Sequence, residues 1–193
     1  MAEGTWRVQH SSEDHTHATP SAFVAWVESS TGRSFDLDAC AIPETAVAPK
    51  FFSPEVDALQ QDWASAGRRV WCNPPYGRGI GDWLEKGLEA SRGITGSDVF
   101  YLLYARTDTK WWHHYVPKAS TVWFLKGRIK FIGNKDGAPA PSVLLHFGGP
   151  QAAYIGTVYT HRDWKKAVPP FERWREGLQR RASSLTENVS AYY

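Results

Sequence analysis

The sequence has 193 residues and a formal charge of +2 at pH 7, from 22 Lys and Arg against 20 Asp and Glu. This length and balance fit one folded domain and exclude a protein made mainly of a disordered, charged tail. The small net charge also argues against a purely electrostatic nucleic-acid binder, although it leaves room for a local basic face. No apolar stretch approaches the roughly 18 residues that a membrane-spanning helix needs.

The N-terminus, the cysteines and a pair of histidines bear on location and metal binding. Residues 1–18 are polar and lack a basic stretch followed by an apolar one, so we expect a flexible arm, no secretory signal and a cytoplasmic location. The two cysteines, Cys40 and Cys72, form no CxxC pair, which fits a reducing compartment and is too few for a cysteine-ligated metal. His113 and His114 are adjacent rather than one helical turn apart, so we expect no metal.

The elements predicted for the first half of the chain alternate between helix, strand and loop. Apolar residues with a helical period predict a helix over 21–29. A short extended piece is expected at 34–39, and the stretch 41–53, which contains two prolines, is expected to be mostly loop. The segment 68–72 predicts a strand that stops abruptly at the Asn-Pro-Pro-Tyr-Gly run 73–77.

The second half of the chain predicts a sheet with helices packed on it. An amphipathic pattern predicts a helix over 80–91, and the continuous apolar run 98–104 predicts a buried strand. The remaining expected elements are a helix at 110–116, strands at 120–125, 128–132, 142–147 and 154–159, and a terminal helix at 169–183. Strands alternating with helices, followed by strands bunched together, predict an α/β domain over 19–193 whose sheet is mostly parallel with an antiparallel end.

The run Asn73-Pro74-Pro75-Tyr76-Gly77 is the most informative about chemistry. It directly follows a predicted strand, where doubly wound sheets bind their ligands. The prolines fix φ at about −65° and remove two backbone donors, so the turn is stiff and presents its carbonyl oxygens as acceptors. The Asn73 side-chain oxygen and the Pro74 carbonyl can then accept both hydrogens of one planar NH2 group, while Tyr76 offers a face to a flat ring. The run therefore predicts a pocket for an exocyclic or amide nitrogen.

A conjugated nitrogen of this kind is a poor nucleophile until its hydrogens are held and its lone pair faces an electrophile. A sulfonium methyl would supply that electrophile, and two acceptors would bind the nitrogen more strongly as it becomes tetrahedral. The motif alone leaves the nitrogen open between N6 of adenine, N4 of cytosine and a glutamine amide of a protein. It also leaves open a strand that simply ends in a proline turn with a packed tyrosine.

Further segments, in a fixed order, resemble those of a known family. They are Thr19-Pro20, the segment Phe-Asp-Leu-Asp-Ala-Cys-Ala at 35–41, Asp57-Ala58-Leu59 followed by Trp63, the segment Ala-Arg-Thr-Asp-Thr at 105–109 with Trp111-Trp112-His113, the segment 127–131 and the segment 140–143. With the Asn-Pro-Pro-Tyr motif, these make the chain from about residue 19 to 147 resemble the phage-type DNA N6-adenine methyltransferases, the Dam-like family of phages and prophages.

This resemblance implies a Rossmann-like methyltransferase fold, S-adenosylmethionine as methyl donor, and adenine in double-stranded DNA, flipped out of the helix, as acceptor. It implies that Asn73 and Pro74 bind the amino group, that Pro75 shapes the turn and that Tyr76 stacks on the base. It assigns the cofactor pocket to Thr19, Pro20, Asp36, Asp38, Ala39 and, as a ribose ligand, Asp57. It also implies a site-specific enzyme, in the host cytoplasm if phage-encoded, with GATC as the family-level target.

One segment departs from the broader methyltransferase class, whose glycine-rich FxGxG loop is replaced here by Asp38-Ala39-Cys40-Ala41. A non-catalytic DNA-binding protein that keeps the fold is therefore the alternative from another class. Among the enzymes, the leading Asn73 resembles the adenine class, since serine is usual at that position in the cytosine class.

Two segments with basic residues are candidates for contact with DNA. The first follows the strand 98–104 and offers donors and a flat ring from Arg106, Thr107, Lys110 and Trp111. In the second, strand alternation places Arg128 and Lys130 on one face of 128–132. The basic residues of the terminal helix are interpreted as its solvated face. We expect a monomer or weak dimer, and the bases that flank the target follow no portable code in the sequence.

Overall fold

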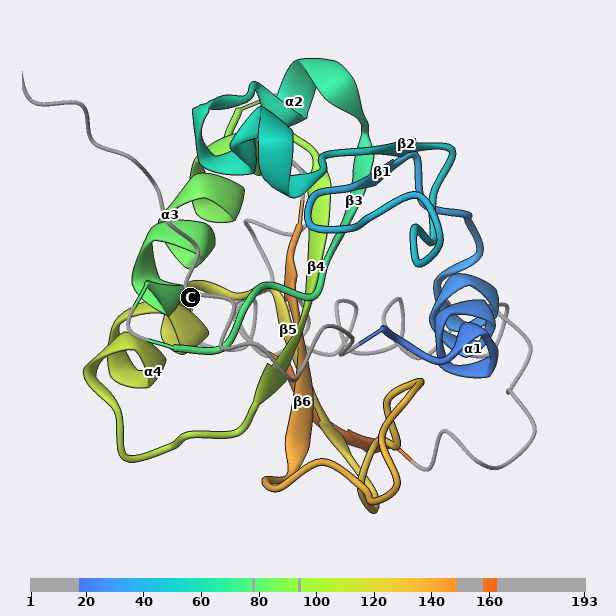
Figure 1. The fold of residues 1–193 in the computed structure, drawn as a ribbon. Helices are drawn as coiled ribbons and strands as arrows, with labels where there is room; N and C mark the ends of the chain where they lie inside the picture. The colour runs from blue at the N-terminus through green and yellow to red at the C-terminus, as the bar shows by residue number, and fades with distance from the viewer. Residues whose placement is uncertain (1–17, 78, 94, 149–157, 163–193) are drawn as a thin grey trace, which may run out of the picture.

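The computed structural model describes residues 18–77, 79–93, 95–148 and 158–162, the last of these as backbone only. Seven strands form one sheet in the order β2-β1-β3-β4-β6-β5-β7 (Figure 1). The strands are β1 (Leu37–Asp38), β2 (Lys50–Phe51), β3 (Arg69–Cys72), β4 (Asp98–Tyr104), β5 (Thr121–Leu125), β6 (Ser142–Phe147) and β7 (Val158–Arg162). All neighbours pair in parallel except at β6, which is antiparallel to both β4 and β5. This is the expected α/β fold of a methyltransferase, with a mostly parallel sheet.

Helices cover both faces of this sheet, as Figure 1 shows. On one face lies α1 (Ser21–Thr31), and on the other lie α2 (Trp63–Ala66), α3 (Ile80–Ala90) and α4 (Lys110–Tyr115). Single 3-10 turns at Pro54–Val56, Ala58–Gln60 and Val116–Lys118 complete the helical elements of the described chain. None of the described helices is long and apolar enough to cross a membrane.

The core consists of two clusters, one on each face of the sheet, and the alternation along β4 divides its side chains between them. Tyr101 and its alternate neighbours pack with α2, α3 and α4. Phe100, Leu102 and Tyr104 pack on the α1 side, where they join the helix residues Phe23, Val24, Trp26 and Val27. Both faces of β4 are therefore buried, as its continuous apolar run predicted.

Helix α3 lies very close to β4 because it has a glycine at the point of contact. A Cβ built on Gly87 would stand 2.1 Å from the Tyr101 hydroxyl oxygen and 2.7 Å from its ring. The same hydroxyl donates a hydrogen bond to the Trp83 carbonyl oxygen on α3, at 2.5 Å. The tyrosine thus takes the space that a side chain at position 87 would need.

Most predicted elements are confirmed. The helices over 21–29, 80–91 and 110–116 and the strands over 68–72 and 98–104 are present within one or two residues. So are the strands expected at 34–39, where only Leu37 and Asp38 pair, and at 120–125 and 142–147. The strand expected at 154–159 is described from Val158, where β7 begins. Residues 1–17 of the expected arm and the helix expected over 169–183 lie outside the described residues, whereas Ala18, the last residue of that arm, forms a bridge with Ile132.

The strand predicted at 128–132 is wrong. Only Ile132 pairs there, through an isolated bridge with Ala18. The predicted alternation is nevertheless present, since Ile129 and Phe131 are buried while Arg128 and Lys130 are exposed. The segment lies along the α1-side cluster and buries every second side chain without joining a neighbouring strand.

Two short elements were absent from the predictions. The stretch 41–53, expected to be mostly loop, contains the two-residue strand β2, and the four-residue helix α2 precedes β3. Each is too short to show a period of its own in the sequence.

Candidate active site

The carboxyl ends of the central strands bring the predicted catalytic and DNA-contacting segments to one edge of the sheet. The 73–77 run leaves β3 directly after Cys72, which pairs with Tyr101 in the middle of β4. The loop 105–109 leaves the end of β4. Because β6 runs the opposite way, its first residue Ser142 pairs with Tyr104 at this same edge. The segment 126–141, which joins β5 to β6, therefore begins and ends there too.

Within the run, Tyr76 is held by three contacts. Its hydroxyl lies 3.1 Å from the Asn73 Oδ1 and 3.2 Å from the Leu102 carbonyl oxygen, so it can donate its hydrogen to either. Its ring stacks on that of Tyr104, with centroids 3.9 Å apart and planes 8° from parallel. Burial, and then the neighbouring Tyr104, raise the pKa of Tyr76 well above its ordinary value of 10, so the ring is neutral.

The other members of the run differ in exposure. Asn73 is half-buried, Pro74 is buried and Pro75 is exposed at the turn. The Asn73 Oδ1 faces the Tyr76 hydroxyl, at 3.1 Å. Asn73 and Tyr76 therefore form one connected unit at the end of β3.

Asp38 lies at the same edge, at the end of β1. Its side chain is buried, and its two oxygens accept hydrogen bonds from the backbone N–H groups of Cys40, at 3.2 Å, and Val47, at 3.1 Å. Burial raises its pKa to about 6, although both backbone bonds act in the other direction. The carboxylate thus orders the backbone from Asp38 to Val47, which includes the Asp38-Ala39-Cys40-Ala41 segment.

A buried acid without a basic partner suits a cationic ligand. Among the described residues no Lys, Arg or His forms an ion pair with Asp38. Each carboxylate oxygen keeps one lone pair after its backbone bond, and a buried carboxylate is stabilised by an opposite charge. The positive groups of S-adenosylmethionine would supply that charge, so Asp38 fits this cofactor.

The remaining predicted cofactor residues are spread around the first strands. Ala39 follows Asp38, is fully buried and donates its N–H to the Trp71 carbonyl oxygen, at 2.8 Å. Thr19 is buried, and Pro20 is the N-cap residue that precedes α1. The bridge from Ala18 to Ile132 joins this corner to the segment 126–141.

The two other predicted acids have partners in the backbone. Asp36 precedes β1, and its Oδ2 accepts from the N–H groups of Arg68 and Arg69, near the start of β3 rather than its end. Asp57 has a left-handed backbone with φ of 45° and accepts from the Leu59 N–H, at 3.3 Å. The structure thus places Asp38 and Ala39 beside the 73–77 run and Asp36 away from it, and cofactor contact by any of these residues remains a prediction.

The predicted DNA-contacting residues flank the same edge. Arg106, Thr107 and Lys110 are exposed, whereas Trp111 is half-buried and packs edge-on against Trp112, with centroids 5.7 Å apart. The residue that caps α4 is Thr109, whose hydroxyl oxygen accepts from the Trp112 N–H.

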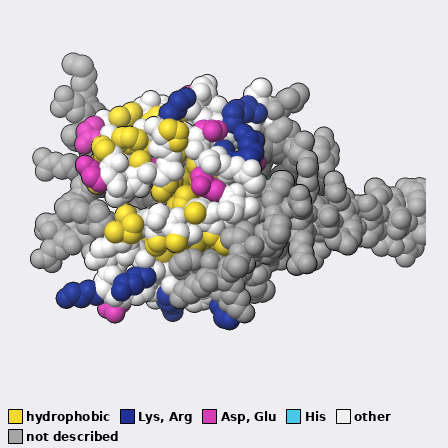
Figure 2. All heavy atoms as spheres, turned by 90° about the vertical axis from the view of Figure 1, so that its right-hand side faces the viewer, with side chains coloured by type: hydrophobic (Ala, Val, Ile, Leu, Met, Phe, Trp, Pro, Cys, Tyr) yellow, Lys and Arg dark blue, Asp and Glu magenta, His cyan; other side chains and the backbone are white. Residues whose placement is uncertain are grey.

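On the α1 side, the segment 126–141 carries exposed basic residues. Arg128 and Lys130 are both exposed, and the Arg128 guanidinium also donates to the Ala138 carbonyl oxygen, at 3.0 Å. Figure 2 faces this side and shows Lys and Arg side chains along its lower border, below a group of hydrophobic ones. Figure 1 places the segment 126–141 at that lower border.

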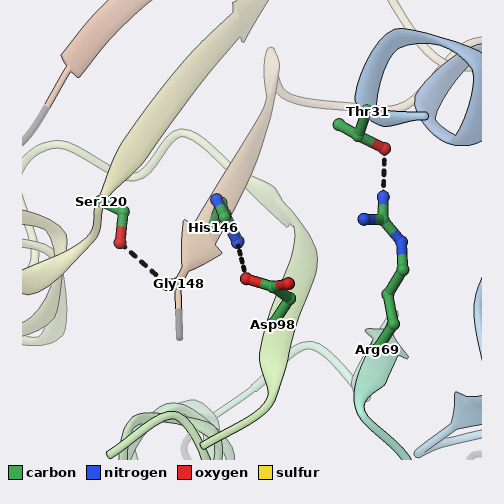
Figure 3. Close-up of polar contacts among 6 residues, drawn as sticks. All are labelled: Thr31, Arg69, Asp98, Ser120, His146 and Gly148. Carbon is green, nitrogen blue, oxygen red and sulfur yellow. Dashed lines mark hydrogen bonds and ion pairs between the residues drawn. The ribbon is translucent and has the colours of Figure 1, made fainter. Parts of the chain in front are cut away.

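The opposite edge of the sheet holds a separate polar group, shown in Figure 3. Arg69 donates to the Thr31 hydroxyl, and His146 pairs with Asp98 at 3.0 Å. The Phe100 ring lies between, with the Arg69 guanidinium 4.5 Å from its centroid and the His146 ring stacked 4.2 Å away. Burial lowers the pKa of Arg69 to about 10. These contacts tie β3, β4, β6 and α1 together at the edge away from the 73–77 run.

Two residues of the site escaped sequence reasoning, namely Tyr104 and Leu102, which both hold Tyr76. The only signal for them is their alternate spacing at the end of an apolar strand. Among the described residues, no group of three His, Cys, Asp or Glu is placed to hold a metal ion.

The chain is similar to a known protein family and to a curated relative. A family model described as DNA N-6-adenine-methyltransferase (Dam) matches residues 7–152, more than half of the chain. A DNA N-6-adenine-methyltransferase of Escherichia phage T1 is 29% identical over 135 residues, which cover 62% of this chain and 55% of that relative. The chain thus spans about half the length of the curated relative that it matches.

Proposed function

We propose that this chain, which belongs to the Dam family of DNA N-6-adenine-methyltransferases, transfers a methyl group from S-adenosylmethionine to N6 of a specific adenine in DNA. The observation that carries the proposal is the Asn73–Tyr76 unit at the end of β3. It combines an amide oxygen, a stiff turn and an aromatic ring at the edge where the fold presents its ligands.

Asn73 and Pro74 bind the adenine amino group in this proposal. The Asn73 Oδ1 and the Pro74 carbonyl oxygen each accept one N6 hydrogen and turn the nitrogen lone pair toward the donor. When bound, S-adenosylmethionine supplies an electrophilic methyl group. As the bond between N6 and the methyl carbon forms, the carbon–sulfur bond of the donor breaks, its electron pair stays on sulfur, and the neutral thioether leaves as S-adenosylhomocysteine. The positive charge that develops on N6 strengthens both hydrogen bonds toward the transition state, which is the condition for catalysis. N6 then loses one of its two hydrogens as a proton to solvent.

Tyr76 and the exposed basic residues bind the rest of the DNA. A paired adenine cannot reach a site at a sheet edge, so it must leave the stack, at a cost of a few kcal/mol. Stacking on the Tyr76 ring offsets this by about 1–3 kcal/mol. Arg106, Lys110, Arg128 and Lys130 flank the unit and suit the phosphates on either side of the extruded base.

The test measures transfer of labelled methyl groups to unmethylated double-stranded DNA. Asn73→Ala should lower the rate by about 100-fold or more, because it removes an acceptor used in the transition state. The affinity for S-adenosylmethionine, measured by calorimetry, should stay within about twofold. The control is Glu89→Ala, which truncates an exposed side chain near the far end of α3 and should leave transfer unchanged.

Other outcomes would replace the proposal. Wild-type protein that binds no S-adenosylmethionine and transfers no label would indicate a non-catalytic DNA-binding protein. Label on cytosine N4 or on glutamine amides of a protein substrate would indicate the other nitrogens. Modification-sensitive sequencing of an unmethylated genome exposed to the enzyme would identify both the base and its neighbours.

A further inference from the structure

We infer that Tyr104 is a positioning residue of this site, which fixes the ring of Tyr76 in the plane on which the extruded adenine stacks. The inference rests on the proposed function. It adds a residue of β4 to the site, whereas the Asn-Pro-Pro-Tyr motif follows β3.

The overlap of the two rings is closer than ordinary core packing. Most aromatic pairs in the described core are tilted or edge-on, with centroids between 5.2 and 6.4 Å apart. The Phe35 ring, for example, lies 5.2 Å from that of Trp71 and 5.5 Å from that of Phe100. Tyr76 and Tyr104 are instead nearly parallel at 3.9 Å. Tyr104 therefore covers one face of the Tyr76 ring, and that face is closed to a base.

Strand β4 holds Tyr76 at two points. The Tyr104 ring supports its face, and the Leu102 carbonyl oxygen lies 3.2 Å from its hydroxyl. Leu102 and Tyr104 are buried and are two residues apart on β4, a central strand bonded to β3 on one side and β6 on the other. The support is thus as rigid as the sheet, whereas Tyr76 itself lies in a loop.

A preset ring lowers the cost of binding the base. A tyrosine side chain that must be ordered on binding loses rotamer freedom, and this loss subtracts from the stacking energy. Because Tyr104 and Leu102 order Tyr76 in advance, the loss is incurred during folding. Removing Tyr104 should therefore weaken base capture and leave cofactor binding untouched.

The test compares Tyr104→Leu with Tyr104→Phe in the full chain. Tyr104→Leu removes the supporting ring and should lower kcat/KM for DNA by about 2- to 12-fold, the range expected for one aromatic pair. Tyr104→Phe keeps the ring and should stay within about twofold of the wild type. The fluorescence of 2-aminopurine at the target position should report less base stacked in the site with Tyr104→Leu, at unchanged affinity for S-adenosylmethionine.

A matched control separates positioning from general stability. Phe100→Leu removes the other parallel stack of β4, that of Phe100 on His146, from the same face of the strand. It should destabilise the fold without changing kcat/KM or the 2-aminopurine signal. If Tyr104→Leu fails to fold, Tyr104→His takes its place. Its kcat/KM for DNA should lie between the value for Tyr104→Phe and the value expected for Tyr104→Leu.

The outcomes distinguish the role of Tyr104 from the proposed function. An active wild type with an unimpaired Tyr104→Leu variant, or equal losses in Tyr104→Leu and Phe100→Leu, would overturn the role of Tyr104 alone. An inactive wild type would overturn the proposed function and, with it, this inference.

Discussion

At the scale of single residues, Asp38 should make the stability of the protein depend on pH. Its pKa rises from 3.8 to about 6 on folding because the carboxyl is buried. Between these values the folded state binds more protons than the unfolded state, so the free energy of unfolding falls as pH rises. The loss contributed by Asp38 is complete near pH 7 and amounts to about 3 kcal/mol.

Urea unfolding of wild type and Asp38→Asn without cofactor, at steps from pH 4 to 7, measures this contribution. The stability of the wild type relative to the variant should fall across the series. Asp62→Asn is a control of opposite sign, since hydrogen bonds from Ser65 lower the pKa of the exposed Asp62. There the relative stability of the wild type should be nearly constant from about pH 5 to 7 and should fall as the pH is lowered through about 4 and below. A wild-type minus Asp38→Asn difference that does not change with pH would contradict the role of burial.

At the scale of elements, the contact of α3 with β4 should reverse the usual effect of alanine in a helix. Gly87→Ala would ordinarily favour the helix, but its Cβ would collide with Tyr101, which is fully buried and bonded to Trp83. We expect a loss of about 1–3 kcal/mol in the free energy of unfolding. Thermal and urea unfolding measure it.

The control lies on the same helix. The Cβ of Gly81→Ala would meet only a Tyr115 ring carbon at 4.0 Å, so this variant should be neutral or more stable by up to about 1 kcal/mol. Adding Tyr101→Phe to Gly87→Ala removes the nearest atom and should recover part of the loss. Equal effects of the two alanine variants would show that close packing at position 87 does not decide the outcome.

The elements also show what the sequence could and could not predict. The helix at α1 and the strand β4 were predictable because burial on one face, or on both, gives each its own apolar pattern. The segment 128–132 has the alternation of a strand because Ile129 and Phe131 pack on the core, yet alternation does not require a paired neighbour. Strand pairing depends on the neighbour, which the local sequence does not contain.

The candidate site also has contacts that the sequence could predict and contacts that it could not. Asn73 and Tyr76 are close in sequence, so their contact was foreseeable from one rigid turn. Tyr104 is far along the chain, and its place beneath Tyr76 depends on how β3 pairs with β4. The backbone partners of Asp36 and Asp38 depend likewise on tertiary packing, so an acidic residue in the sequence does not reveal whether it faces a ligand or a backbone amide.

At the scale of the whole molecule, we expect a local basic edge to bind DNA although the net charge is only +2. Lys110 is the first residue of α4, and Lys130 lies in the segment 126–141 on the α1 side; both are exposed. Each phosphate contact adds about −0.9 to the slope of log affinity against log salt on duplex DNA. Removing both lysines, as Lys110→Ala with Lys130→Ala, should make the slope about 1.8 units shallower. Fluorescence anisotropy across a salt series measures the slope.

A charge-matched control uses the opposite edge. Arg33 and Arg92, beyond the C-terminal ends of α1 and α3, are exposed and lie away from the 73–77 run. Replacing both with alanine lowers the net charge equally and should leave the slope unchanged. Equal slopes for the two double variants would place the DNA elsewhere on the surface.

The reversed direction of β6 has a consequence for how such an enzyme can change over time. The segment 126–141 is a long hairpin whose two ends are pinned by one ladder, Phe124 opposite Val143. Insertions or deletions at its tip leave that ladder in register. They also leave Asn73 and Tyr76 in place, because these residues follow β3. Changes of length in this hairpin would therefore reshape the surface beside the 73–77 run without displacing Asn73 or Tyr76.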